Sequence, residues 1–331
     1  MRHALWARAR AWVRPLPVVL GAVVALVAAG GVWSALGPRE DVNPRGRIVI
    51  TTGQQRGVYY SWATALARET HAAYPGLEVQ VLGSSGSPEN LHRVSTGVAD
   101  VGLSTEDVTQ DPGATATASR PVDRSKLVAL ARVYDDYVHV VVRADGPIHS
   151  LADLAGRPVA TGQPGSGVAV VAGRVLAEAR VTVESQAVGL DAGMAMLQRR
   201  ELDAVFWSGG LPTRAVADLA RRVRLRLLPL DSVSAALRER FGVAYRPAQI
   251  PAGSYGLTAP VATLASPNLL VARPDADPAV VRALLDTMFR RRDAIAAAVP
   301  AANALDRRSA ISTGSLPLHP AAVAYYRATK P

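Results

Sequence analysis

Two short loops carry the residue types best suited to bind an anionic group. Residues 52–57 read TGQQRG and residues 163–167 read QPGSG, and each loop lies between a predicted strand and a predicted helix. Glycines and the free backbone N–H groups of a first helical turn suit a carboxylate or a phosphate. The first loop matches no nucleotide-binding fingerprint, and by itself it is equally well explained as a tight turn. The pair of loops favours a ligand held from both sides.

Groups that could perform chemistry are scarce. The chain contains no cysteine, which excludes disulfides, cysteine-ligated zinc, iron–sulfur clusters and thiol nucleophiles. The histidines lie far apart without metal-ligand spacing, and no Gly-x-Ser-x-Gly motif marks a serine nucleophile. His319 is expected at a helix start or on the surface, and Asp135-Asp136 and Asp275/Asp277 are expected in turns and caps. We therefore predict no enzymatic activity, no catalytic residue, no metal and no cofactor.

Residues 1–37 have the composition of a membrane-targeting segment. Four arginines precede an uncharged, apolar stretch from Pro15 to Gly37, which is long enough to cross a bilayer. Since positive charge stays on the cytoplasmic side, the rest of the chain is predicted outside the cytoplasmic membrane. The segment is either a cleaved signal peptide or an uncleaved transmembrane anchor. Its length and its weak small-residue cleavage site favour the anchor.

The formal net charge is +10, and the four arginines of the terminal segment contribute part of it. The remaining arginines are scattered along helical and loop stretches, where solvated faces are the simplest explanation. No aromatic residues interleave with them as a base-stacking platform requires. Nucleic acid is therefore not predicted as a partner.

Strand, loop and helix alternate along the chain, which is typical of an α/β fold with a parallel sheet. β-branched runs predict buried strands over residues 47–52, 77–82 and 98–103. Ligands in such sheets lie at the carboxyl ends of the strands, against helix N-termini. A predicted strand over residues 137–142 leads into a second unit of the same kind.

The chain returns to the first unit through a predicted strand over residues 261–272, followed by one long helix over residues 277–298. Two crossings between two α/β units describe a two-lobed fold with a hinge. After a linker over residues 38–46, we assign residues 47–140 with 262–331 to lobe 1 and residues 141–261 to lobe 2.

An ordered set of short motifs over residues 47–328 resembles the TAXI family, the extracytoplasmic solute-binding subunits of one class of TRAP transporters. In chain order the motifs are Thr52-Gly53, Gly57-Val58-Tyr59-Tyr60, Gly83-Ser84-Ser85-Gly86-Ser87, Glu89-Asn90-Leu91, Ala99-Asp100-Val101-Gly102, Asp107-Val108, Leu154-Ala155-Gly156-Arg157, Pro164-Gly165-Ser166-Gly167 and residues 316–326, LPLHPAAVAYY. The resemblance implies a two-lobed periplasmic-binding-protein-like fold and small acidic ligands such as glutamate or related dicarboxylates. It also implies partnership with a membrane permease driven by a sodium or proton gradient.

The resemblance, matched position by position, implies that the ligand-binding residues come from both lobes. Tyr60 is the better of two adjacent tyrosine candidates, because Tyr59 falls on the buried face of its helix. Trp207 is equally well explained as a core tryptophan between the lobes. The implied ligand-binding residues are Arg56, Gly57, Tyr59, Tyr60, Ser85, Gly86, Ser87, Asn90, Glu106, Ser166, Gly167, Trp207, Gly209 and Gly210.

The sequence departs from the family pattern in two places. Gln54, Gln55 and Arg56 stand where the first loop of the family usually has small residues. Glu106 stands where a neutral hydroxyl is usual. Either Glu106 pairs with Arg56 and the pocket stays near neutral, or the ligand itself carries a positive group.

These patterns together predict a receptor that captures a small acidic or zwitterionic organic solute, such as a dicarboxylate or an amino acid, for a TRAP-type permease. An alternative is a membrane-tethered solute sensor that uses the same fold without a dedicated permease. In either case the predicted location is extracytoplasmic, in the periplasm or on the outer face of the cytoplasmic membrane. The N-terminal segment either tethers the protein to that membrane or is removed on secretion.

Overall fold

The computed structural model describes residues 44–111 and 122–329. The predicted signal or anchor segment over residues 1–37 and most of the linker over residues 38–46 lie outside the described residues. Within the two described ranges, no helix is both long enough and apolar enough to cross a membrane.

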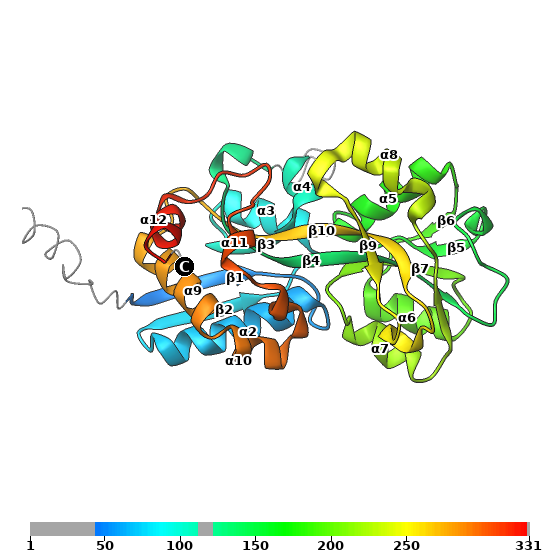
Figure 1. Ribbon diagram of the computed structural model, residues 1–331, viewed down its shortest axis with the longest axis horizontal. Coiled ribbons are helices and arrows are strands. Elements are labelled where there is room, and N and C mark those ends of the chain that lie inside the picture. Colours follow the sequence, from blue (N-terminus) through cyan, green and yellow to red (C-terminus); the bar gives the residue numbers. More distant parts are fainter. Residues whose placement is uncertain (1–43, 112–121, 330–331) are drawn as a thin grey trace, which may run out of the picture. The chain divides into compact units, whose positions relative to one another are not determined.

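The described residues form a mixed α/β fold built on one ten-stranded sheet (Figure 1). Its main path runs β2-β1-β3-β10-β4-β7-β5-β6, while β8 pairs with β4 and β9 pairs with β10. The strands are β1 (Gly46–Thr51), β2 (Leu77–Leu82), β3 (Val101–Thr105), β4 (Val128–Arg143), β5 (Pro158–Ala160), β6 (Glu184–Gln186), β7 (Ala204–Gly209), β8 (Leu225–Leu227), β9 (Arg246–Ile250) and β10 (Val261–Ala272).

Helices separate most of the strands, as the alternating pattern of the sequence predicts. The α-helices are α2 (Val58–Ala73), α3 (Ser87–Ser95), α4 (Glu106–Gln110), α5 (Gly167–Ala179), α6 (Leu190–Gln198), α7 (Arg214–Ala220), α8 (Asp231–Phe241), α9 (Pro278–Arg290), α10 (Arg292–Ala298), α11 (Arg307–Ala310) and α12 (Pro320–Ala328). In lobe 1, β1 is parallel to both β2 and β3, and in lobe 2, β5 is parallel to both β6 and β7. The carboxyl ends of these strands therefore meet at one edge in each lobe.

Two long antiparallel strands, β4 and β10, join the lobes. One end of β10 pairs with β3 of lobe 1 and the other end pairs with β9, while β4 pairs with β7 of lobe 2. Figure 1 shows the two strands running side by side from one group of elements to the other. They are the two crossing segments that a hinged two-lobed fold requires.

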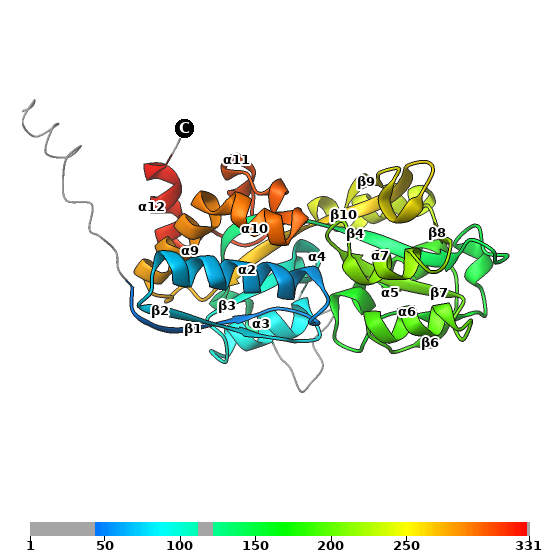
Figure 2. The same cartoon turned by 90° about the horizontal axis from the view of Figure 1, so that it is seen from below.

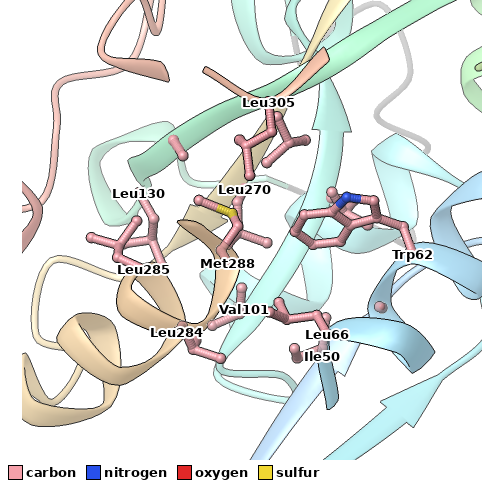
Figure 3. Packing of buried hydrophobic residues seen from close by; sticks show 14 of the residues in the cluster. Ile50, Trp62, Leu66, Val101, Leu130, Leu270, Leu284, Leu285, Met288 and Leu305 are labelled. Atoms are coloured by element: carbon pink, nitrogen blue, oxygen red, sulfur yellow. The ribbon is translucent and has the colours of Figure 1, made fainter. Parts of the chain in front are cut away.

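The hydrophobic core of lobe 1 lies on both faces of its part of the sheet. Trp62 and Leu66 of α2 pack with Leu284 and Met288 of α9 and with Leu270 of β10 (Figure 3). On the other face, α3 packs against the alternate side chains of β10. Figure 2 shows α2, α9 and α10 gathered on one side of β1 and β2. Successive side chains of β10 therefore point to opposite faces of the sheet and pack against a different helix layer on each face, as expected for a strand.

The core of lobe 2 is built in the same way around β7. Phe206 packs with Val175 of α5 and Leu237 of α8, while its strand neighbour Val205 packs on the opposite face. Val138 of β4 and Leu264 of β10 also belong to this core. Both crossing strands therefore contribute side chains to each lobe.

Three predicted elements differ from the structure. The single helix expected over residues 277–298 is two helices, because Arg291 has ψ of 17° and interrupts the helical path. The strand expected over residues 98–103 begins only at Val101, since Val98 is exposed. The strand expected over residues 137–142 begins at Val128.

Asp135 and Asp136 lie inside β4, so their assignment to a turn was wrong. The physical reason is that side chains of the same strand and of neighbouring strands bind both carboxylates within the sheet. Asp135 pairs with Arg132 and Arg246, and Asp136 accepts a hydrogen bond from Asn268. No turn is then needed to expose them to water.

Candidate functional site

A cavity of about 60 Å³ lies between the carboxyl ends of the strands of the two lobes. Since one buried water needs about 10–15 Å³ on the same measure, this space suits a few waters or a small organic molecule. Its lining comes from loops and helix starts of both lobes. The lining residues are Gly53, Gln54, Gly57, Val58, Tyr59, Ser85, Gly86, Ser87, Thr105, Asp107, Asp136, Gly167, Val168, Trp207, Ser208 and Gly209.

Besides the five-residue α4, three longer helices begin at this cavity. The N-caps of α2 and α3 are Gly57 and Gly86, and neither has a side chain to bond the first N–H groups. Ser166 caps α5 by accepting from the backbone N–H of Ala169. The positive ends of three helix dipoles therefore point toward one small space.

Glycines lie where the two lobes approach each other, and the backbone of Gly86 calls for one. Gly86 has φ of +127°, which an L side chain rarely adopts, and a Cβ there would lie 3.6 Å from the backbone N of Gly167. A Cβ on Gly167 would in turn lie 3.4 Å from Oγ of Ser87. The two loops predicted to hold a ligand, residues 52–57 and 163–167, both line this cavity, through Gly53, Gln54 and Gly57 on one side and Gly167 on the other.

A buried chain of hydrogen bonds runs along the lobe 1 side of the cavity. The Tyr59 hydroxyl donates to Oδ1 of Asn268, and its oxygen lies 3.3 Å from Oγ of Ser87. The amide nitrogen of Asn268 donates to Oδ1 of Asp136 over 2.7 Å. Burial raises the pKa of the Tyr59 hydroxyl well above its usual value, so this group acts as a neutral donor. Asn268 therefore links a tyrosine on α2 to a carboxylate on β4.

The two carboxylates in the lining belong to Asp136 and Asp107, which are 4% and 3% exposed. Burial, first of all, raises the pKa of Asp136 to about 7, and the nearby Asp107 adds to the rise. Oδ2 of Asp107 accepts a 2.7 Å hydrogen bond from the Tyr245 hydroxyl and lies 3.5 Å from the Arg174 guanidinium. Oδ1 of Asp107 has no hydrogen-bond partner within the part of the chain that the structure describes.

The predicted site residues divide into two groups. Those that line the cavity are Gly57, Tyr59, Ser85, Gly86, Ser87, Gly167, Trp207 and Gly209. Those that lie outside its lining are Arg56, Tyr60, Asn90, Glu106, Ser166 and Gly210. Of the two adjacent tyrosines, Tyr60 was the preferred candidate, but Tyr59 is the one that lines the cavity. The Tyr59 ring packs in the core, and its hydroxyl bonds to Asn268.

Of the two alternatives given for Glu106, its pairing with Arg56 is wrong. The Arg56 guanidinium lies 2.5 Å from Asp218 and 3.4 Å from Asp191, both in lobe 2. Glu106 instead accepts a 2.8 Å hydrogen bond from the backbone N–H of Ser315. Its carboxylate turns toward that loop because a backbone donor is available there, so Glu106 does not set the charge of the cavity.

Three further predicted residues hold the loops in place. The Asn90 amide donates to the carbonyl oxygens of Thr52 and Leu103, and so ties the ends of β1 and β3 together. Ser166 caps α5. Gly210 leaves space for its neighbours, since a Cβ there would lie 3.0 Å from Cβ of Ala301.

Sequence reasoning missed Asp136 as a cavity residue. Its signal was present in the alternation along residues 128–143, where Asp136 shares a face with the buried Tyr134 and Val138. A carboxylate on the inward face of a strand is unusual, and it marks a site. Among the described residues, no group of three or more histidine, aspartate or glutamate side chains could hold a metal ion.

Solved structures of similar fold include MatC from Rhodopseudomonas palustris with bound malate, at 12% identity over 85% of this chain and 95% of MatC, with a TM-score of 0.56. A protein of Bordetella bronchiseptica RB50 is 22% identical over 87% of this chain and 90% of its own, with a TM-score of 0.48. The likeness to MatC confirms the predicted two-lobed α/β fold class. The sequence pattern of the NMT1-like family matches residues 50–328, and this chain therefore belongs to the NMT1-like family.

Proposed function

We propose that this protein captures a small organic solute outside the cytoplasmic membrane and performs no chemistry on it. The observation that carries the proposal is the cavity between the lobes, lined by the uncapped starts of α2 and α3 and by the start of α5. Such a space at strand ends of two α/β units suits reversible capture of one small molecule. Its described lining contains no cysteine, histidine or lysine that could activate a nucleophile.

The lobes close around the solute by a hinge in β4 and β10, with residues 47–140 and 262–331 moving against residues 141–261. Contacts between the lobes support this closure. Arg56 pairs with Asp218, and Oε1 of Gln54 accepts a 3.1 Å hydrogen bond from the backbone N–H of Leu190. These contacts join the two lobes beside the cavity, which Gln54 lines, so separation of the lobes must break them.

The partner of the receptor is a TRAP-type permease, in keeping with the ordered TAXI-like motifs over residues 47–328. The protein works in the periplasm or at the outer face of the cytoplasmic membrane, tethered by its N-terminal segment or released after its removal. A gene for such a permease is expected beside the gene for this protein. Its absence from the genome would argue against delivery to a TRAP permease.

A thermal-shift screen of the purified full-length chain tests capture. A ligand that binds only the folded protein stabilises it by about 2.7 kcal/mol at a hundredfold excess over Kd, which raises the melting temperature. The panel contains amino acids, amines and dicarboxylates, each also checked for chemical change by mass spectrometry. We expect at least one compound to raise the melting temperature and to be recovered unchanged.

Two variants on α5 make the screen specific for the cavity. Gly167→Val places methyl groups beside Ser87 and Thr105, so it fills the space and should abolish the shift. Gly173→Val is the matched control, because a Cβ there meets nothing within 4 Å. Equal shifts in both variants would show that the solute binds elsewhere, and turnover of a compound without any shift would show an enzyme instead.

A further inference from the structure

The charge of the cavity is opposite to that expected for a receptor of acidic solutes. Its described lining contains two carboxylates, from Asp107 and Asp136, and no arginine, lysine or histidine. A dicarboxylate in this space would lie against both acids without a cationic side chain in the lining to balance it. Like charges that share one buried cavity repel strongly, because little water is present to screen them.

Among residues 44–111 and 122–329, no cationic side chain forms an ion pair with Asp136. Its two oxygens accept from the neutral groups of Asn268, over 2.7 Å, and Ser208, over 3.5 Å. The charged groups that act on it, Asp107 and Asp135, are both acidic. Asp135 belongs to a separate ion pair with Arg132 and Arg246, so these arginines are already engaged.

Asp107 is only partly balanced by its neighbours. Arg174 and the Tyr245 hydroxyl both act on Oδ2, while Oδ1 is buried and has no partner. A buried acceptor left without a hydrogen bond is costly, and so it normally has a donor in the working state of the protein. Asp107 also lines the cavity, so its side chain lies beside any solute bound there.

We propose that the solute carries an ammonium group, and that this group docks against Asp136 with Asp107 as the second acid of its site. The proposal rests on the proposed function and names the substrate class of the same cavity. An ammonium nitrogen offers up to three donors, which suits two carboxylates that are otherwise held by few partners. The helix starts at Gly57, Gly86 and Ser166 suit an anionic group at the other end of the same molecule.

Isothermal titration calorimetry on the full-length chain tests the proposal with three sets of probes. Ethanolamine and putrescine carry ammonium groups without a carboxylate, alanine and glutamate carry both groups, and succinate and malate carry carboxylates alone. We expect binding in the first or second set, and affinity for succinate and malate at least about tenfold weaker. Binding of the amino acids alone would show that the helix starts also hold a carboxylate.

Asp136→Asn removes the charge while it keeps the size of the side chain, and Asp135→Asn is its matched control on the same strand. We expect Asp136→Asn to weaken binding of the ammonium ligand by about tenfold or more, without lowering the melting temperature of the ligand-free protein. Asp135→Asn should leave affinity within about threefold, since Asp135 lies outside the lining. A purely structural role of Asp136 would instead lower the melting temperature together with the affinity.

Two other outcomes separate this inference from the proposed function. If succinate or malate binds and Asp136→Asn leaves or improves that affinity, the protein is a solute receptor but the ammonium assignment is wrong. If no probe in the three sets binds and the wider thermal-shift panel also gives nothing, both the capture of a small solute and its ammonium group are refuted.

Discussion

The free energy of unfolding of the wild-type protein should fall as pH rises, because the buried Asp136 becomes ionised. Replacing Asp136 by asparagine should prevent this fall. Burial raises the pKa of Asp136 from 3.8 to about 7 in the folded protein. Folding therefore favours the protonated carboxyl, and this contribution is fully present below pH 4 and lost as pH rises to about 7. A shift of about 3 pH units corresponds to about 4 kcal/mol at 1.36 kcal/mol per unit. The asparagine variant has no carboxyl to ionise, so it should not show that loss.

Urea unfolding of the ligand-free chain at pH 5 and pH 8 measures the effect. The free energy of unfolding of Asp136→Asn relative to wild type should rise by about 2–4 kcal/mol between these pH values. The difference between the two proteins is used because other buried groups also titrate. Burial lowers the pKa of His139 to about 4 and raises that of Glu106, and both groups are present in each protein.

Asp135→Asn serves again as control. Asp135 lies on the same strand, but it forms ion pairs with Arg132 and Arg246 and lies outside the lining of the cavity. Asp107 and Asn268, which also act on Asp136, are unchanged in either variant. Asp135→Asn removes only the smaller charge effect of Asp135 on Asp136, so the control should show a much smaller change between the two pH values. If the stability difference between wild type and Asp136→Asn is equal at pH 5 and pH 8, the reasoning about the buried carboxyl is refuted.

Three further substitutions test the closure, the core and one glycine. Arg56→Ala removes a half-exposed ion pair between the lobes, so ligand affinity measured by calorimetry should fall by at most about fivefold, and less at high salt. A larger loss that persists in 1 M salt would contradict an electrostatic contact. Trp62→Ala should lower the free energy of unfolding by about 3–5 kcal/mol in urea, because the fully buried ring leaves a cavity. Gly314→Ala should cost about 1–3 kcal/mol, since φ is +57° and the new Cβ would overlap Glu106, whereas Gly173→Ala should cost nothing.

The fold could be predicted largely because its evidence is local. β1, α2, β2 and α3 are each marked by a hydrophobic run, a glycine turn or a cap within a few residues, and β10 was predicted with its observed bounds. The early part of β4 was missed because its polar residues resemble a turn. Only the pairing of β4 with β10, more than 100 residues away, makes those residues compatible with a strand.

The candidate site could be predicted in part, for a related reason. Loops that follow parallel strands must gather at one edge, so Gly57, Ser87 and Gly167 could be placed together without knowing any contact. The choice of partner for a charged side chain is not local. Arg56 selects Asp218, 162 residues away in the chain, over the predicted Glu106. Nothing in the spacing of residues along the sequence reveals that choice.

Arg174 links Asp107, which lines the cavity, to the other lobe, and replacing it should strongly lower the free energy of unfolding. It extends from α5 of lobe 2, lies 3.5 Å from Asp107 on α4 of lobe 1, and donates to the Tyr245 hydroxyl over 3.1 Å. Arg174→Met keeps the apolar stem but leaves Asp107 buried without a cation, so the free energy of unfolding should fall by about 3–5 kcal/mol in urea. Adding Asp107→Asn should restore much of that stability, because no buried charge then remains. A double variant no more stable than Arg174→Met would mean that Arg174 acts through packing on Phe241 alone.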